Sequence, residues 1–191
     1  MAEETEGQRI MVKRYIQSFI SMKYVFVLPG LALGVFVCTF LYTSSHNEVL
    51  RYIGIGFGII LFAVMVFYYK EKLSVNHQLK QVKDLDDFSD AVMIGQAFFL
   101  EERMLGYAKG KIYDLSYGEI ETIHYRSDSR GKMFLDLHTA KGDLPVEMAL
   151  KDQAKRVAMF LQTKNPQAEV TGIEPAGEGT LHSIDPYRNE K

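Results

Sequence analysis

The chain has 191 residues, a single cysteine and a formal net charge of −2 at pH 7. One cysteine excludes an intrachain disulfide and any metal site built from cysteine ligands. The charge is unevenly distributed, because residues 1–83 carry nine Lys or Arg and five Asp or Glu, whereas residues 84–191 carry 13 and 19, a net charge of −6. Phosphate backbones repel such an acidic part, so we expect no nucleic-acid partner.

An amphipathic pattern opens the chain. A helix over residues 10–22 would place four large side chains on one face: Met11, Tyr15, Phe19 and Met22. The pattern fits a helix at the headgroup level of a membrane, and it fits equally well a plain extension of the helix that follows. Residues 1–23 are therefore expected to be a cytosolic or interfacial segment.

Two uncharged apolar runs follow, at residues 24–42 and 52–69. Each has about the length that a helix rising 1.5 Å per residue needs to cross a hydrocarbon core roughly 30 Å thick. The polar residues 43–48 between them are enough to reverse the chain. Residues 24–69 are therefore predicted to form a two-helix transmembrane hairpin with the lipid bilayer as its partner, and Cys38 is interpreted as an apolar filler within it.

The positions of Lys and Arg predict an orientation. The loop between the runs offers only Arg51, whereas seven basic residues flank the outer ends: Lys13, Arg14, Lys23, Lys70, Lys72, Lys80 and Lys83. Such residues are retained on the cytoplasmic side, so we expect a multi-pass protein of the cell membrane with both termini in the cytosol.

Small residues recur four positions apart within the runs, as Gly30, Gly34, Gly54 and Gly58. This spacing lets helix backbones approach closely in lipid. The four glycines are predicted to pack the two helices of the hairpin together, with homodimerisation as the alternative. Neither run contains an ionisable side chain of the Asp, Glu, Lys, Arg or His type, which argues against a channel or transporter.

Residues 70–90 contain no Gly or Pro and are predicted to be a helical linker. The linker ends in four carboxylates: Asp84, Asp86, Asp87 and Asp90. Because the spacing, Gly and final Glu of a calcium loop are missing, we interpret this cluster as solvated.

From residue 91 the pattern changes to short strands separated by turn residues. Six strands are expected, at 93–100, 104–108, 111–115, 120–126, 133–138 and 144–147. The strands 120–126 and 133–138 flank a turn rich in Ser, Asp and Gly, so they should form a hairpin.

One amphipathic helix then closes this domain. Apolar residues repeat at helical spacing as Ala154, Val157, Ala158 and Leu161. Asp152 lies near the expected start of the helix, and Pro166 follows its end. The predicted fold class is therefore a membrane α-hairpin plus an α+β domain, residues 91–166, in which a small antiparallel β-barrel or sandwich is capped by a C-terminal helix.

Three stretches of this domain carry a resemblance: residues 112–123, residues 135–142 and the helix end Lys164-Asn165-Pro166. Their pattern of strands and turns resembles the bacterial pleckstrin-homology-like (PH-like) domains that follow one or two membrane helices. The resemblance implies a small barrel capped by a helix, in a family largely without assigned function. It carries no catalytic motif that could be transferred to this chain.

Residues 167–191 contain five Gly or Pro: Gly172, Pro175, Gly177, Gly179 and Pro186. This composition predicts a flexible tail, either passive or acting as a tether or short recognition segment.

No motif for catalysis is present. The sequence lacks HExxH, Gly-x-Ser-x-Gly and the glycine-rich phosphate loops, so we expect neither an enzyme nor a cofactor. His124 and His138 lie on neighbouring expected strands with Glu121 and Asp136 close in sequence, so a metal site is conceivable. Histidines on a solvated strand face are far commoner, and no metal is expected.

The turn of the expected hairpin is basic. Arg126, Arg130 and Lys132, together with free backbone N–H groups, could hold a lipid phosphate, although Asp128 lies among them. A solvated turn is the other interpretation.

These features predict a non-enzymatic, membrane-anchored binding or scaffold module that presents its domain to membrane-associated protein partners at the cytosolic face. Two alternatives remain. One is a lipid-headgroup sensor that uses the basic turn, and the other is an accessory subunit of a larger membrane complex.

Overall fold

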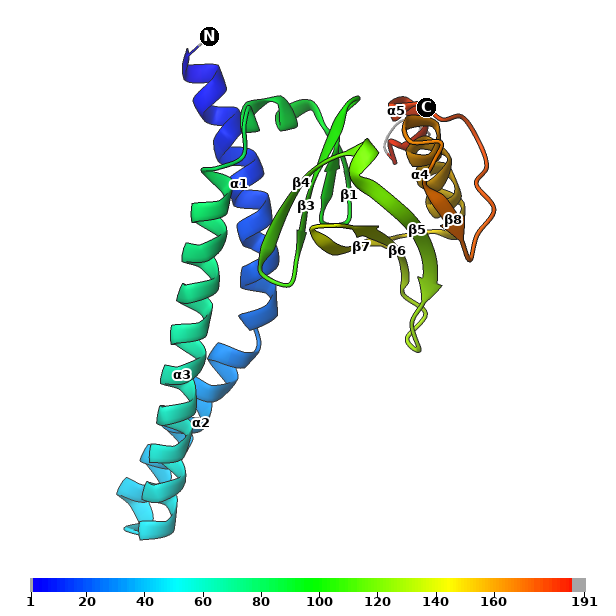
Figure 1. The fold of residues 1–191 in the computed structure, drawn as a ribbon. Helices are drawn as coiled ribbons and strands as arrows, with labels where there is room; N and C mark the ends of the chain where they lie inside the picture. The colour runs from blue at the N-terminus through cyan, green and yellow to red at the C-terminus, as the bar shows by residue number, and fades with distance from the viewer. Residues whose placement is uncertain (1, 187–191) are drawn as a thin grey trace. The chain divides into compact units, whose positions relative to one another are not determined.

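The computed structural model of the chain describes residues 2–186, with side chains from Val12 onwards except at Ser89. The chain divides into two units. One unit is Lys13–His77, which is helical, and the other contains the residues from Gln78 onwards together with the start of the chain (Figure 1).

The helical unit contains most of three helices: α1 (Ala2–Tyr24), α2 (Val27–Ser45) and α3 (Glu48–Leu79). Two stretches are long and apolar enough to cross a membrane, Val12–Ser45 and Glu48–Leu79. The first is interrupted at Val25 and Phe26, between α1 and α2, and Val25 lies four residues before Pro29. A proline ring clashes with the carbonyl four residues earlier, which explains why the helix breaks at Val25.

The connection between α2 and α3 is shorter than the predicted polar stretch 43–48. Thr43, Ser44 and Ser45 still belong to α2, and Glu48 already belongs to α3. His46 adopts a left-handed conformation (φ 50°) and its N–H bonds the Tyr42 carbonyl at 2.8 Å. The Asn47 side chain then accepts the Val49 N–H at 3.0 Å and caps α3. Two residues therefore suffice to reverse the chain.

The four predicted packing glycines have different surroundings. A Cβ added at Gly34 would lie 3.2 Å from the Phe57 ring, and one at Gly54 would lie 3.2 Å from the Cys38 Cβ. At Gly30 and Gly58 an added Cβ would meet nothing within 4 Å. Close helix approach within the hairpin therefore depends on Gly34 and Gly54.

Polar pairs join α1 to α3. Gln17 Nε2 donates to Asn76 Oδ1 at 2.6 Å, and the Glu71 carboxylate accepts from Lys23 Nζ at 2.6 Å and from the Tyr24 hydroxyl at 3.0 Å. The buried side chains of α1 that the structure describes are Val12, Ile16 and Ile20, spaced four apart. Of the face predicted for an interfacial helix, Met22 is 68% exposed, and the side chain of Met11 lies outside the described residues.

The predicted helical linker 70–90 is only partly α-helical. Helix α3 continues to Leu79, and a 3₁₀ helix, η1 (Leu85–Asp90), follows an irregular stretch that ends at Asp84 with φ 47°. Two four-stranded sheets come next. Their strands are β1 (Val92–Ile94), β2 (Ala97–Phe99), β3 (Arg103–Ala108), β4 (Lys111–Ser116), β5 (Ile120–Ser127), β6 (Met133–Thr139), β7 (Gly142–Met148) and β8 (Glu169–Thr171).

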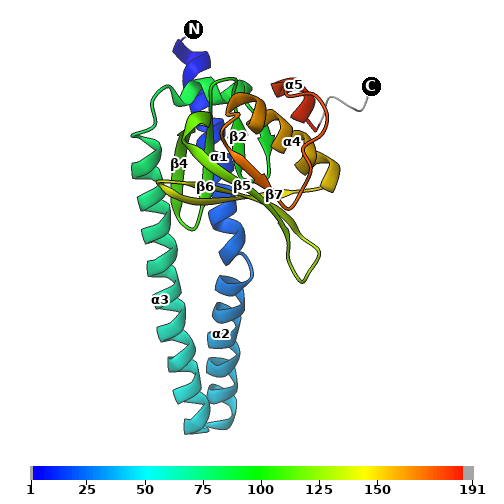
Figure 2. The same cartoon turned by 45° about the vertical axis from the view of Figure 1, so that its right-hand side comes forward.

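The first sheet is antiparallel with the order β1-β2-β3-β4, and the second has the order β7-β6-β5-β8, with β8 parallel to β5. Helix α4 (Lys151–Lys164) packs against β6, β7 and β8 (Figure 2). This is the predicted combination of strands and a following helix. The barrel alternative is wrong, because both sheets are open and keep free edges.

Tyr117 holds the corner where the chain passes from the first sheet to the second. It belongs to the 3₁₀ turn η2 (Tyr117–Glu119), and its ring packs edge to face on Phe160 of α4 at 5.3 Å between centroids. Its hydroxyl donates to the carbonyls of Leu100 and Arg103 at 2.5 and 3.1 Å. Burial, followed by the nearby charge of Glu101, raises the pKa of the Tyr117 phenol far above its usual value, so the group remains a donor.

The expected strand 93–100 is in fact two strands. Gly95 turns the chain with φ 55°, and an added Cβ there would approach the Glu147 carbonyl to 2.6 Å. Next to it, Gln96 Nε2 donates to the Pro145 carbonyl at 2.7 Å. The turn between β1 and β2 therefore sits directly on the backbone of β7 and ties the two sheets together.

The tail predicted from residue 167 is also partly folded. Residues 169–171 form β8, and helix α5 (Leu181–Ile184) places Ile184 in the core with 1% exposure. Between them, the Ala176 N–H bonds the Lys155 carbonyl of α4 at 3.3 Å. The expectation of a flexible tail is therefore wrong for this part of the chain, while residues 187–191 lie outside the described residues.

Replacing Gly106 should destabilise the α+β unit, because a Cβ at this position of β3 would overlap the Leu144 side chain of β7. We expect Gly106→Ala to lower the free energy of unfolding by about 1–3 kcal/mol. The measurement is thermal unfolding of the sheets in the full chain in detergent, followed by infrared absorbance. Gly118→Ala, where an added Cβ meets nothing within 4 Å, should change stability by less than about 0.5 kcal/mol.

Truncating Ile184 tests whether the tail belongs to the fold. Because Ile184 is buried, Ile184→Ala should cost about 2 kcal/mol or more in the same unfolding measurement. The exposed neighbour His182 provides the control, and His182→Ala should leave stability unchanged. Equal stability of both variants would contradict a structural role for α5.

Candidate functional site

Strand β4 forms one free edge of the first sheet, since β3 pairs with it on one side only. In the antiparallel register, Tyr113 lies opposite Gly106 and Asp114 opposite Leu105. Alternate residues of a strand direct their backbone groups to opposite sides. The N–H and C=O groups of Ile112, Asp114 and Ser116 are therefore the ones that point away from the sheet.

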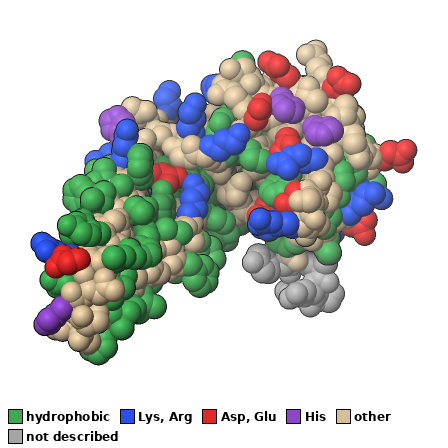
Figure 3. Space-filling view, turned by 90° about the horizontal axis from the view of Figure 1, so that it is seen from below, with side chains coloured by type: hydrophobic (Ala, Val, Ile, Leu, Met, Phe, Trp, Pro, Cys, Tyr) green, Lys and Arg blue, Asp and Glu red, His purple; other side chains and the backbone are tan. Residues whose placement is uncertain are grey.

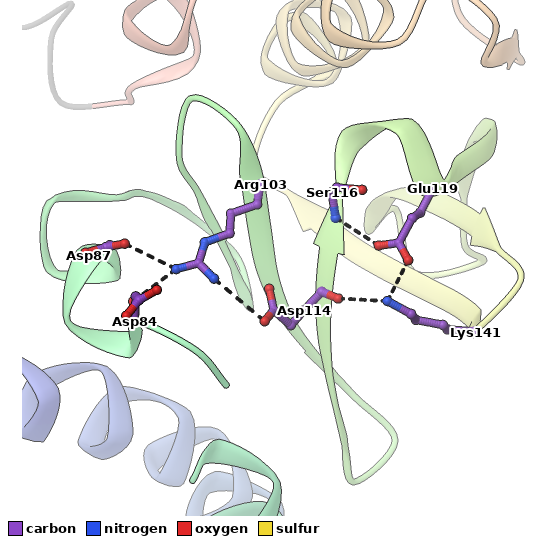
Figure 4. A network of polar contacts seen from close by, with 7 residues as sticks. All are labelled: Asp84, Asp87, Arg103, Asp114, Ser116, Glu119 and Lys141. Carbon is purple, nitrogen blue, oxygen red and sulfur yellow. Dashed lines mark hydrogen bonds and ion pairs between the residues drawn. The ribbon is translucent and has the colours of Figure 1, made fainter. Parts of the chain in front are cut away.

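Side chains occupy three of these outward-facing groups. Gln78 Oε1 accepts the Ile112 N–H at 2.8 Å, while its Nε2 donates to the Gly110 carbonyl at 3.2 Å. Lys141 Nζ donates to the Asp114 carbonyl at 3.3 Å, and Glu119 Oε2 accepts the Ser116 N–H at 2.9 Å (Figure 4). Each of these contacts supplies a hydrogen bond that a neighbouring strand would otherwise make.

Glu119 and Lys141 also bind each other. Their ion pair measures 2.6 Å between Oε1 and Nζ, and the side chains are 38% and 54% exposed. The hydrogen bond from Lys141, assisted by the Ser116 N–H, lowers the pKa of Glu119 below its usual value. Ion pairs this exposed contribute only about 0–1 kcal/mol, so the side chains can leave the edge at little cost.

Arg103 organises the polar cluster beside this edge. Its guanidinium donates to the Asp84 carbonyl at 3.1 Å and to Asp87 Oδ2 at 3.2 Å, and it lies 3.8 Å from Asp114 Oδ2 (Figure 4). The same group stacks over the Phe88 ring at 4.9 Å. The acidic end of the linker, which we interpreted as solvated, is thus partly fixed by Arg103.

A hollow of about 290 Å³ runs along this edge. Its lining residues are Gln78, Gln81, Val82, Lys111, Ile112, Tyr113, Asp114 and Lys141. In the described part of the chain, the Asp114 N–H and the Ile112 C=O have no hydrogen-bond partner. The site therefore combines two open backbone groups, an apolar wall and two amines, which suits recognition of an extended chain.

Metal ligation finds no support among residues 12–186, where no three His, Cys, Asp or Glu side chains converge. The two strand histidines are engaged separately. His124 Nδ1 lies 2.8 Å from the Thr171 hydroxyl, and His138 Nδ1 lies 2.7 Å from Asp143 Oδ1.

The predicted phosphate-binding turn joins β5 to β6 and projects from the sheet (Figure 2). Arg126 pairs with Asp136 and stacks on the Phe134 ring at 4.4 Å. Lys132 pairs with Glu147 at 2.7 Å, and this hydrogen bond raises the pKa of Lys132.

The backbone of this turn is engaged as well. Asp128 Oδ1 accepts the N–H groups of Arg130 and Lys132, both at 2.9 Å. Of the three predicted cations, only the Arg130 side chain lacks a partner among the described residues. The turn therefore offers one free guanidinium rather than a three-residue phosphate clamp.

The edge of β4 was not apparent from the sequence. Its only local signal is the capping box of Ser116 and Glu119, which marks the turn after the strand. Lys141 lies 27 residues beyond Asp114, so their contact depends on how the two sheets meet.

No protein-family model, curated protein or solved structure matches this chain.

Removing Lys141 should raise the pKa of Glu119 towards its usual value, since Lys141 is the main cause of the lowered pKa. A depressed folded pKa adds stability that is complete above the unfolded pKa of about 4.5 and is lost as the pH falls through the folded pKa. Lys141→Met should therefore reduce the loss of folding stability that Glu119 causes at acid pH. Carboxyl NMR titration of the full chain measures the pKa of Glu119, and the Glu119→Gln variant identifies its resonance. An unchanged Glu119 titration would contradict the ion pair.

Proposed function

We propose that the chain is a non-enzymatic binding module anchored in a membrane by the α2–α3 hairpin. The observation that carries the proposal is that only 6% of the residues in the most apolar stretch of each long helix are buried. Hydrophobic side chains cover much of the helices in the view of Figure 3. A soluble protein rarely leaves so large an apolar surface in water, whereas lipid would cover it favourably.

Side-chain chemistry along the helices supports a lipid environment. The hydroxyls of Thr39, Thr43 and Ser44 each donate to the carbonyl four residues earlier, so they leave no polar group unsatisfied. Tyr24 and Tyr68 pack edge to face at 5.2 Å between centroids, near the end of the apolar runs where amphipathic rings are favoured. The basic residues that flank the outer ends of the two apolar runs then favour a multi-pass protein with both termini in the cytosol.

The α+β unit is the part that we propose binds a partner. The order of its elements, strands followed by helix α4, supports a PH-like unit, although its two open sheets do not close the barrel that the resemblance implies. The absence of a catalytic motif in the sequence favours binding over catalysis, and the hairpin would raise the local concentration of the unit for membrane-associated proteins. The open positions Gly30 and Gly58 leave room for a second copy or for helices of a larger complex.

Charged residues placed in the hairpin test the membrane anchor. Ile59 and Phe62 are exposed and lie inside the second apolar run, so replacing both with Arg should cost several kcal/mol of insertion free energy. We expect the wild-type chain to stay in the membrane pellet after alkaline carbonate washing. The double variant should move largely to the soluble fraction or be degraded.

A matched control separates insertion from a general effect of charge. Met22 and Leu73 are each 68% exposed but lie outside the apolar runs. Replacing both with Arg should leave the chain in the pellet. A wild-type chain extracted by carbonate, or a reporter on the C-terminus found outside the cell, would contradict the proposal.

A further inference from the structure

We propose that the free edge of β4 binds an extended basic peptide from a membrane-associated protein, which adds to the sheet as an antiparallel strand in place of the Lys141 and Glu119 side chains. This inference rests on the proposed function, because it names the class of partner that the anchored unit would bind. Strand addition of this kind takes its affinity from backbone hydrogen bonds and its specificity from side chains next to them.

Asp114 is the residue of β4 whose backbone is best placed to bind a partner strand. Asp114 directs both its N–H and its C=O outwards, and a residue facing it in an antiparallel strand would bond to both. Among the described residues, the N–H has no partner and the C=O is bonded by the Lys141 amine alone, at 3.3 Å. The Ile112 C=O is the second open group, while the Ile112 N–H stays bonded to Gln78.

The side chains that now cover the edge are partly exposed to water. Lys141 is 54% exposed and Glu119 is 38% exposed, so both reach water if they swing away. The hollow beside them leaves space along the strand, and Val82 and Tyr113 give it an apolar wall. An incoming strand could direct alternate apolar side chains to this wall.

The charges at the edge favour a basic peptide. The Lys141 amine already lies between the Asp114 carbonyl and the Glu119 carboxylate, so this position accepts a cation. A residue facing Asp114 would also place its side chain beside the Asp114 carboxylate, which the Arg103 guanidinium approaches only to 3.8 Å, so a Lys or Arg there is still attracted. The net charge of −6 in residues 84–191 adds a long-range attraction.

A second copy of the chain is a poor occupant for the same reason. Pairing two β4 strands about Asp114 would bring two carboxylates face to face, which is destabilising. Basic segments are common on the cytoplasmic side of membrane helices. A unit anchored at that surface would meet such segments at high local concentration.

The test uses the full chain in nanodiscs of neutral phosphatidylcholine, so that the peptides do not bind to anionic lipid. The probe is a nine-residue peptide of alternating threonine and valine with lysine at its centre. Two matched peptides differ from it at one point: one has glutamate at the centre, and the other carries a methyl group on the backbone nitrogen of the central lysine. Affinity is measured by calorimetry, and amide exchange is measured by NMR.

We expect the lysine peptide to bind at least tenfold more tightly than either matched peptide. It should slow exchange of the Asp114 amide at least tenfold and leave the Ile112 amide, which is already bonded to Gln78, nearly unchanged. Lys141→Ala should tighten binding several-fold, because the competing amine is gone. Lys151→Ala, which removes a cation that does not line the hollow, should have no effect.

Three results would overturn the inference: no binding of the lysine peptide at millimolar concentration, equal binding of the methylated peptide, or unchanged exchange at Asp114. Self-association through β4 that blocks the peptide would overturn it as well. A chain that remains in the membrane pellet but ignores the peptides contradicts only this inference. A chain that never enters the membrane contradicts the proposed anchor.

Discussion

Satisfying backbone hydrogen bonds is the constraint on which both units of this chain depend. The helices α1, α2 and α3 meet it internally, with a break between α1 and α2 at Val25-Phe26 and a two-residue turn, His46-Asn47, between α2 and α3. The sheets meet it by pairing, except at their free edges. There the chain uses two different solutions: β8 pairs with the edge of β5, and side chains replace a strand along β4.

Much of this fold follows from sequence patterns, because the patterns reflect local geometry. The apolar runs fix the long helices, and Ala154, Val157, Ala158 and Leu161 are all buried as the spacing of α4 predicts. Five expected strands are found within two residues of their predicted ends. The remaining expected strand, 93–100, is divided by a turn at Gly95. That turn is set by contact with the Glu147 backbone rather than by a local dipeptide signal.

Long-range pairing accounts for what the sequence did not reveal. Strand β8 has three residues and pairs with β5, whose His124 lies 47 residues before Thr171. Such a short strand carries no periodicity of its own. In the β5–β6 turn, the sequence counts three cations, but Asp136 and Glu147 neutralise two of them from neighbouring strands. Charge counted along a chain therefore overstates the charge that a turn offers to a ligand.

The buried position of Ile184 sets an order of events during synthesis. The helical hairpin is complete once residue 79 has left the ribosome, whereas the core of the α+β unit lacks one of its members until residue 184 has been added. Domains form as their residues emerge, from the N-terminus onwards. The apolar helices are thus complete some hundred residues before the sheets can close their core, so in the proposed membrane-anchored chain the nascent unit would finish folding while already tethered.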